Sequence, residues 1–411
     1  MKAKRLNVLS NKLSLCTLIT LFLYIYYAAF PAQVALGGDL PENPVVQVGA
    51  PTITSDGMDM TVNAGASDKT WIDWRGGFNI GANNSVDNIG PSASAAILHH
   101  DVSGVISNIQ GALTGNCNVF LLNPSGVLFA PGAQVNVGGL VVSTLNMSLD
   151  NFKSGNYSFN SNGIAEPGLI VNAGEITATN PFGVTLMAGA VRNAADGVIN
   201  ANLGTVNLVS GSEVTLNLTN NGSIQAVVNK EVLNNVYDKD DNRVTVGVEN
   251  VGDIYANGGQ VFMEAEAVND VFTTLINQNG LVKAGSMVNK GGKIVLVSNS
   301  NGIVQNTGTL NASAIESGAK GGTIEMRGQK VGQFSLAHAD AIDGNGGNIT
   351  LYGRDVVVLS PDSLTTANAG LNGDGGIVTV YSPDTALFWS DALIEAKGGT
   401  VSGDGGFVEV S

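Results

Sequence analysis

The chain has 411 residues, of which 54 are glycine and only 6% are aromatic. It is too long for one compact core and too poor in large apolar side chains to fill one, so the composition favours a repeating architecture in which each unit packs on its neighbour. The 34 acidic and 19 basic residues give a formal net charge of −15, which opposes binding to nucleic acid or to anionic lipid.

Residues 1–37 have the pattern of a secretory signal peptide. Four basic residues stand near its start: Lys2, Lys4, Arg5 and Lys12. An apolar run of about 15 residues begins at Leu13, and small residues follow it. The run is shorter than the ~20 residues of a membrane-spanning helix, so a membrane anchor is the less favoured interpretation. Cleavage near Ala32 or Gly37 removes four bases and no acid, which leaves 15 basic and 34 acidic residues and a net charge of −19.

The chain has two cysteines, and Cys16 lies inside the expected leader. Cys117 is then the only thiol of the mature protein, and no intrachain disulfide can form. Exported domains often depend on disulfides, whereas a chain threaded unfolded through a pore could not tolerate one. We therefore expect the stability to come from the stacking of repeated units.

Residues 118–144 contain apolar runs on either side of a tight turn. Asn123-Pro124 starts the turn, because proline restricts φ and asparagine bonds to its own backbone, and Gly126 supplies a permissive position. From residue 134 to 137, polar residues alternate with valines, which is the period of a strand with one buried face. Residues 180–183, Asn-Pro-Phe-Gly, repeat the turn pattern without enough context to mark a second motif.

Two short phrases recur through the rest of the chain. Glycine, any residue, an aliphatic, any residue and alanine begins at Gly174, Gly197, Gly222, Gly252, Gly280 and Gly308. Gly-Gly, any residue and an aliphatic begins at Gly258, Gly291, Gly321, Gly346, Gly375 and Gly405. Both share a period of 23 to 33 residues, so one unit contains at least two strands and their corners.

These repeats predict an all-β fold, a right-handed parallel β-helix solenoid with an N-terminal capping region. Leucine-rich repeats and propellers fit less well, because the units lack their leucine-asparagine and Trp-Asp patterns. At about 25 residues per coil the mature chain makes on the order of 15 coils and a rod of about 70 Å. The abundant asparagines form turns and can bond to one another between coils. Trp71 and Trp74 could stack on sugars, but capping of the open core is the favoured role.

Residues that could carry chemistry do not form a recognisable pattern. His99, His100 and His338 lack the spacing of zinc ligands or of a base beside a nucleophile. Asp340 and Asp343 are expected in separate turn positions with no basic partner nearby. We expect no enzyme activity, no metal and no cofactor, and a β-helical carbohydrate-active enzyme remains an alternative.

One segment imitates a calcium-binding loop. Asp238, Asp240, Asn242 and Glu249 occupy positions 1, 3, 5 and 12 of the template. Position 6 is Arg243, where the template needs glycine. A polar hairpin turn is therefore the favoured interpretation.

Residues 74–147 resemble the filamentous-haemagglutinin secretion domain of two-partner secretion exoproteins. The resemblance rests on these segments: Trp74, Phe78 to Gly81, Ser107 to Gly111, and the 118–144 block. Asn123-Pro124-Ser125-Gly126 matches the family's Asn-Pro-Asn-Gly motif with serine in the third place, which keeps the turn chemistry. His99-His100-Asp101 stands where relatives more often carry an asparagine-arginine pair, which puts a local recognition role there in doubt.

The resemblance implies a partner, an outer-membrane β-barrel transporter whose periplasmic domains capture the chain before it folds outside. It implies that Asn123, Pro124, Ser125 and Gly126 are the export motif that this transporter recognises. The expected domains are a signal peptide (1–37), the secretion domain (38–290, core signature about 70–190) and further β-helix repeats (291–411), the chain being a fragment of a longer protein.

The expected output is a secreted, surface-displayed adhesin or haemagglutinin that binds a host cell, a glycan or a matrix. Nucleic-acid binding and stable membrane insertion are not expected. The alternatives to adhesion are the carbohydrate-active enzyme above, or capture of haem or delivery of a toxin by an effector part beyond residue 411.

Overall fold

The computed structural model describes residues 40–164, 168–298 and 302–411. The expected signal peptide, residues 1–37, lies outside the described residues. Within the described part the fold is almost entirely β, and α2 (Leu149–Ser154) is the one helix there. No helix of the described residues is long and apolar enough to cross a membrane.

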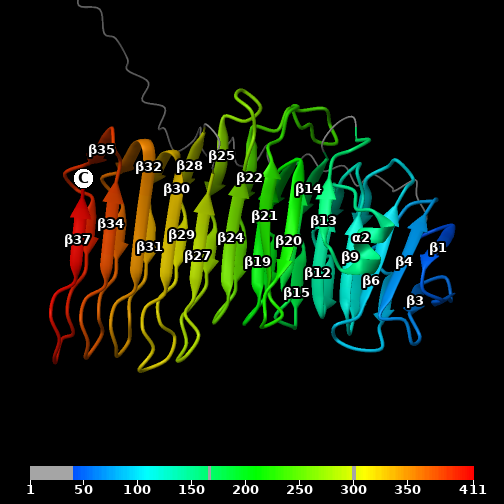
Figure 1. The fold of residues 1–411 in the computed structure, drawn as a ribbon, viewed down its shortest axis with the longest axis horizontal. Helices are drawn as coiled ribbons and strands as arrows, with labels where there is room; N and C mark the ends of the chain where they lie inside the picture. The colour runs from blue at the N-terminus through cyan, green and yellow to red at the C-terminus, as the bar shows by residue number, and fades with distance from the viewer. Residues whose placement is uncertain (1–39, 165–167, 299–301) are drawn as a thin grey trace, which may run out of the picture. The chain divides into compact units, whose positions relative to one another are not determined.

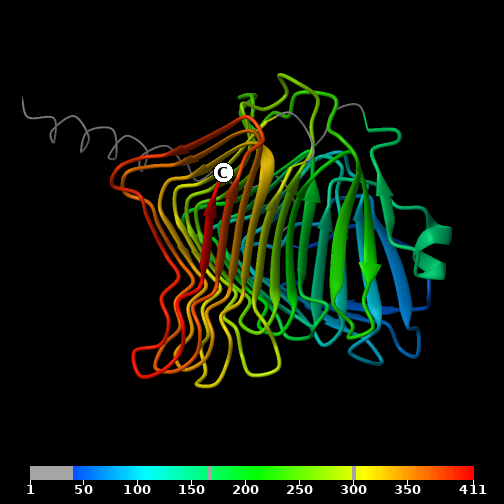
Figure 2. The same ribbon diagram turned by 60° about the vertical axis from the view of Figure 1, so that its left-hand side comes forward.

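The described chain winds into stacked coils whose strands form three faces (Figure 1 and Figure 2). Face 1 contains β4 (Lys69–Trp74), β6 (Ala96–Asp101), β9 (Asn118–Leu122), β12 (Gly139–Ser143), β16 (Val184–Ala188), β19 (Thr205–Ser210), β24 (Gln260–Ala265), β27 (Lys293–Val297), the first halves of β30 (Thr323–Gln333) and β32 (Asn348–Leu359), β34 (Ile377–Tyr381) and β37 (Phe407–Val410). Face 2 contains β7 (Ser107–Ile109), β10 (Val127–Phe129), β14 (Leu169–Asn172), β17 (Ala190–Asn193), β22 (Val246–Asn250), β25 (Thr274–Gln278), β28 (Ile303–Asn306), the second halves of β30 and β32, and β35 (Thr385–Phe388).

Face 3 is a separate sheet. Its parallel strands are β3 (Asp59–Asn63), β5 (Ser85–Ile89), β8 (Ala112–Gly115), β11 (Gln134–Val137), β15 (Glu175–Ala178), β18 (Val198–Asn200), β23 (Asp253–Tyr255), β26 (Leu281–Lys283), β29 (Thr309–Asn311), β31 (Leu336–His338), β33 (Leu364–Thr366) and β36 (Leu393–Glu395). The predicted parallel β-helix is therefore confirmed.

The predicted N-terminal cap is confirmed as well. β1 (Pro44–Val48) pairs antiparallel with β4, and β2 (Thr52–Ser55) pairs antiparallel with β3. These two strands cover the first parallel strand on faces 1 and 3, so that neither presents an open edge at this end. Face 3 has 13 strands, of which β2 is antiparallel. The twelve others mark about twelve coils and a stack of about 55 Å at the usual strand spacing, fewer and shorter than expected from the sequence.

Two insertions explain the difference, and both leave the coil between face 1 and face 2. The segment after β12 carries α2 and β13 (Ser158–Asn160), and the segment after β19 carries β20 (Glu213–Leu218) and β21 (Ile224–Lys230). β13, β20 and β21 form a three-stranded antiparallel sheet outside the coils. The phrase at Gly222 was therefore wrongly counted as a coil, since it opens β21, and β18 pairs directly with β23.

The inserted elements cover the outer side of face 1 with a second apolar core, here called the outer cluster. Its aromatic members are Trp71, Phe120, Phe152, Tyr157, Phe159 and Phe182, and its aliphatic members include Leu98, Met187 and Leu216. The ammonium of Lys69 in β4 donates to the carbonyls of Phe152 and Lys153 at 2.8 and 2.9 Å, which ties down the C-terminal end of α2.

Trp71 and Trp74 do not share a role, because alternate residues of a strand point to opposite sides. Trp74 is fully buried inside the first coil. Trp71 points outward, where its ring centroid lies 5.5 Å from that of Phe152. The capping role predicted for Trp71 is wrong, since it anchors the inserted helix.

An amide ladder runs along the inside of face 2, as the asparagine content indicated. Asn172 Nδ2 donates to Asn193 Oδ1, and Asn193 Nδ2 donates to Asn250 Oδ1, both at 2.8 Å. Asn250 Nδ2 then donates to Gln278 Oε1 at 2.6 Å. Each of these side chains is fully buried, so the ladder satisfies polar groups that would otherwise be costly in the core.

Candidate functional site

The predicted export motif, Asn123 to Gly126, forms the corner between β9 and β10. The same corner, between face 1 and face 2, releases both insertions in later coils. Ser125 N donates to Asn123 Oδ1 at 2.9 Å, and Gly126 N donates to Asn123 O at 3.0 Å. Gly126 has φ +118°, and a Cβ there would lie 2.9 Å from the carbonyl oxygen of Leu169. The turn chemistry expected from the sequence is present.

Asn123 points into the protein. It is fully buried, and its Nδ2 lies 2.8 Å from Val105 O, 2.9 Å from Ser107 Oγ and 3.1 Å from Asp101 Oδ2. Its backbone N donates to Ser143 O at 2.9 Å. The side chain of Asn123 thus connects its coil to the preceding coil, and its backbone N–H connects the same coil to the next one.

Asp101, at the end of β6, gathers hydrogen-bond donors around a buried carboxylate. It is 2% exposed. In addition to Asn123 it accepts from Phe78 N at 2.8 Å, from Ser107 Oγ at 2.7 Å, and from Ser103 N and Oγ at 3.0 and 2.7 Å. Within the described residues its charge is balanced by these donors and not by a lysine or arginine. Sequence reasoning missed this role, because a lone aspartate after a strand carries no signal of burial.

His99 is part of the same buried region. Trp74 Nε1 donates to His99 Nδ1 at 3.1 Å, and His99 Nε2 lies 2.7 Å from Asn88 Oδ1. Burial lowers the pKa of His99 to about 3, so the ring is neutral and Nε2–H donates to Asn88. Its neighbour His100 points outward and lies 3.0 Å from Asp73 Oδ1. The histidine pair is thus split between the core and the surface.

A loop of exposed apolar side chains lies against the corner. Val102, Val105 and Ile106, between β6 and β7, are 43%, 66% and 37% exposed. The carbonyl of Val105 accepts the bond from Asn123, so the corner holds this loop in place. Apolar residues within the turn-forming segment Val-Ser-Gly-Val-Ile-Ser are the signal in the sequence that could have indicated it.

The second Asn-Pro turn lies at a different corner, between β15 on face 3 and β16 on face 1. Phe182 N donates to Asn180 Oδ1 at 3.0 Å, and Gly183 N donates to Asn180 O at 3.2 Å. The backbone pattern therefore matches that of the export motif. The side-chain amide differs, since Asn180 Nδ2 reaches Asn118 Oδ1 and Ala93 O instead of a buried carboxylate.

The residues of the calcium-loop template do not come together in one loop. Asp238 to Asn242 form the predicted hairpin turn, since Tyr237 and Arg243 pair as an antiparallel bridge. Glu249 lies apart in β22 and pairs with Arg192 at 3.1 Å. No group of three or more His, Cys, Asp or Glu residues that could hold a metal occurs in the described ranges.

One expectation about Asp340 is wrong. It does have a basic neighbour, since His338 Nδ1 lies 3.7 Å from its Oδ2, because residues two apart in extended chain point to the same side. Thr366 Oγ1 donates to Asp340 Oδ2 at 2.7 Å and is 4% exposed. The hydroxyl is thus engaged and buried, and this cluster serves to join neighbouring coils.

The family model of the TPS secretion domain, the two-partner secretion domain, matches residues 32–312. A heme/hemopexin-binding protein of Haemophilus influenzae, strain Rd, is 32% identical over 293 residues, which are 69% of this chain and 30% of that protein. A second heme/hemopexin-binding protein of H. influenzae is 28% identical over 276 residues, 63% of this chain and 28% of that protein. The chain therefore spans less than a third of the length of these curated relatives.

A solved structure has the same fold. The crystal structure of the HMW1 secretion domain from H. influenzae superposes with a TM-score of 0.66 at 24% identity, covering 90% of this chain and 100% of that one.

Proposed function

Because this chain belongs to the family of TPS secretion domains, whose exoproteins are secreted through the outer membrane, we propose that a β-barrel transporter recognises its N-terminal coils. The recognition site that we propose is the corner Asn123–Gly126 together with the loop Val102–Ile106. The family match carries this proposal, and the buried corner and exposed apolar loop support its location. Apolar side chains gathered on an exposed surface are typical of a site that meets a partner.

The burial of Asn123 sets the order of events. Its amide is fully used by Asp101, Val105 and Ser107 in the folded coil, so the transporter can contact this side chain only before the coil closes. An extended segment can then add to a sheet edge of the partner through main-chain hydrogen bonds. When the corner closes, the side-chain amide of Asn123 loses its contact with the transporter and forms its hydrogen bond to Asp101. This exchange favours release of the chain from the transporter.

Folding outside the cell can draw the remaining chain outward. At about 0.05 to 0.15 kcal/mol per residue, a coil of about 25 residues contributes about 1 to 4 kcal/mol. Each coil contacts only its neighbours, so folding can propagate from the antiparallel cap as the chain emerges. We place the secretion domain at residues 38–290, after a leader of 37 residues, and regard residues 291–411 as further coils of the same stack.

For the exoprotein as a whole we propose capture of haem or of a haem-carrying protein such as hemopexin. The names of the two H. influenzae relatives support this. This proposal replaces adhesion as the favoured function, since the names of these relatives indicate binding of haem and hemopexin and not adhesion. The effector part that makes this contact is proposed to lie outside the 411 residues.

Secretion of the natural full-length protein, with and without its cognate transporter, tests the export proposal. Replacing Asn123-Pro124 by Ala-Ala should abolish release while the leader is still removed, and Asn180-Pro181 replaced by Ala-Ala is the matched control with the same turn. Normal release of the first variant, or release without any transporter, would count against the proposal. Surface plasmon resonance on immobilised hemopexin and a spectroscopic titration with free haem, both with the secreted full-length protein, test the second part. Binding to neither hemopexin, with or without its haem, nor free haem would overturn it.

A further inference from the structure

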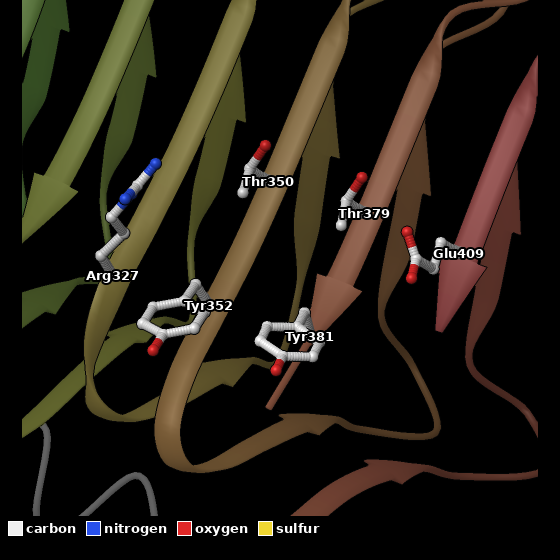
Figure 3. A pocket seen from close by; sticks show the side chains of 6 residues that line it. All are labelled: Arg327, Thr350, Tyr352, Thr379, Tyr381 and Glu409. Carbon is white, nitrogen blue, oxygen red and sulfur yellow. The ribbon is translucent and has the colours of Figure 1, made fainter. Parts of the chain in front are cut away.

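The outer side of face 1 changes character along the stack. Over the early coils the inserted helix and sheet cover it with the outer cluster. Over β30, β32, β34 and β37 the described residues leave the sheet uncovered, and its outward side chains line a shallow depression of about 180 Å³ (Figure 3). The depression is lined by Arg327, Thr350, Tyr352, Thr379, Tyr381 and Glu409.

Two tyrosines form the aromatic part of this depression. Tyr352 and Tyr381 are direct register partners on β32 and β34. Their ring centroids are 5.7 Å apart and their planes are within 18° of parallel, and Figure 3 shows the rings side by side on the sheet. Tyr381 is 40% exposed. The coil repeat thus places two nearly parallel rings on the surface, one on each of two neighbouring strands.

Polar groups surround the rings. Thr350 and Thr379 are register partners two residues before the tyrosines on the same strands, and Thr379 is in register with Glu409 on the last strand. Arg327 is in register with Tyr352 on the other side, and its Nε pairs with Glu325. Hydroxyl, carboxylate and guanidinium groups therefore lie within one or two strand spacings of the aromatic rings.

We propose that this depression, the tyrosine strip, binds an uncharged extended glycan. Nearly parallel aromatic rings with a few polar groups at fixed positions are the chemistry that holds the apolar C–H faces and the hydroxyls of a sugar. The spacing of sugars in an extended β-1,4-linked chain is close to the strand spacing of about 4.8 Å, so consecutive sugars can lie over consecutive coils. The excess of acidic over basic residues opposes anionic polymers, and the small volume has room for about six waters, not for a folded domain.

Isothermal titration calorimetry of the secreted chain with cellohexaose, chitohexaose and maltohexaose tests the proposal, with a heparin hexasaccharide as the anionic comparison. Cellohexaose or chitohexaose, which are β-1,4-linked and extended, should bind more tightly than the helical α-1,4-linked maltohexaose, and Tyr352→Ala with Tyr381→Ala should weaken that binding roughly tenfold or more. Tyr237→Ala is the matched control, since Tyr237 is 44% exposed in the hairpin turn and should leave the affinity unchanged.

Two further variants separate binding from folding. Tyr352→Phe with Tyr381→Phe keeps both rings and should retain affinity within a few-fold. Thr379→Lys, a change at a half-buried, outward-facing position of the strand, should block the depression without altering the thermal unfolding midpoint.

The proposal is overturned if no neutral hexasaccharide binds at millimolar concentration, if heparin binds more tightly, or if the double alanine variant and Thr379→Lys bind as well as the natural chain. It is also overturned if the strip proves to hold a second copy of the chain, seen as a dimer in sedimentation that the double alanine variant loses.

Discussion

Replacing Asp101 by asparagine tests how far the buried carboxylate stabilises the export-motif corner. The two oxygens of Asp101 accept five hydrogen bonds, and two of them come from Ser103. An amide of the same shape has one oxygen and one NH2 group. If the amide oxygen of the new asparagine points toward Asn123, its NH2 group faces the backbone N–H of Ser103. That N–H then has no acceptor.

The expected cost follows from this count. A buried donor left without a partner costs about 1 to 3 kcal/mol, and the remaining bonds lose the strength that an ionised acceptor adds, so we expect the free energy of unfolding to fall by about 2 to 4 kcal/mol. Equilibrium unfolding in guanidinium chloride, followed by circular dichroism, measures it. Asp59→Asn is the control, since Asp59 is exposed and bonds one hydroxyl, that of Ser85, and should cost less than about 1 kcal/mol. A loss at Asp101 no larger than at Asp59 would refute the reasoning.

Burial lowers the pKa of His99 to about 3 from 6.5, so the unfolded chain binds the extra proton between these values and stability rises with pH there, by up to about 1.4 kcal/mol per unit. Burial raises the pKa of Glu264 to about 7 from 4.5, so stability falls as pH rises across that window; unfolding of Glu264→Gln from pH 4.5 to 6.5 should therefore show a steeper rise than the natural chain, and an identical profile would contradict this. Burial also raises the pKa of Cys117 to about 11, so a maleimide should label it only after unfolding, and labelling of the native protein would exclude a closed core. Asn250→Ala breaks the amide ladder on both sides and should cost about 2 to 4 kcal/mol in the same unfolding assay, with an unchanged midpoint as the opposing result.

Much of the β-helix could be read from local signals. A Gly-Gly phrase precedes every face 1 strand from β24 onward, and the alternation at residues 134–137 appears as buried valines between exposed polar residues. The phrase at Gly222 predicted a coil that does not exist, for an equally local reason. Glycine followed by alternating residues opens any strand, and whether that strand stacks on the coil or pairs in a separate sheet depends on distant partners.

The candidate site shows the same division. The Asn-Pro-Ser-Gly turn was predictable, since proline, asparagine and glycine restrict their own backbone. The inward direction of Asn123, the five donors around Asp101 and the exposure of Val105 were not predictable, because they depend on residues brought together from several coils. The pairing of His338 with Asp340 was missed because Asp340 was assigned to a turn, whereas it continues the extended chain after His338, so that both side chains point to the same side.

The sequence by itself determined the stacking, because a coil of small apolar residues between glycine corners can bury its core only against another such coil. The tertiary structure alone decided which segments leave the stack and which side chains face inward. Those outcomes depend on contacts between coils, and a period-two pattern specifies that residues alternate but not which partner each side will meet.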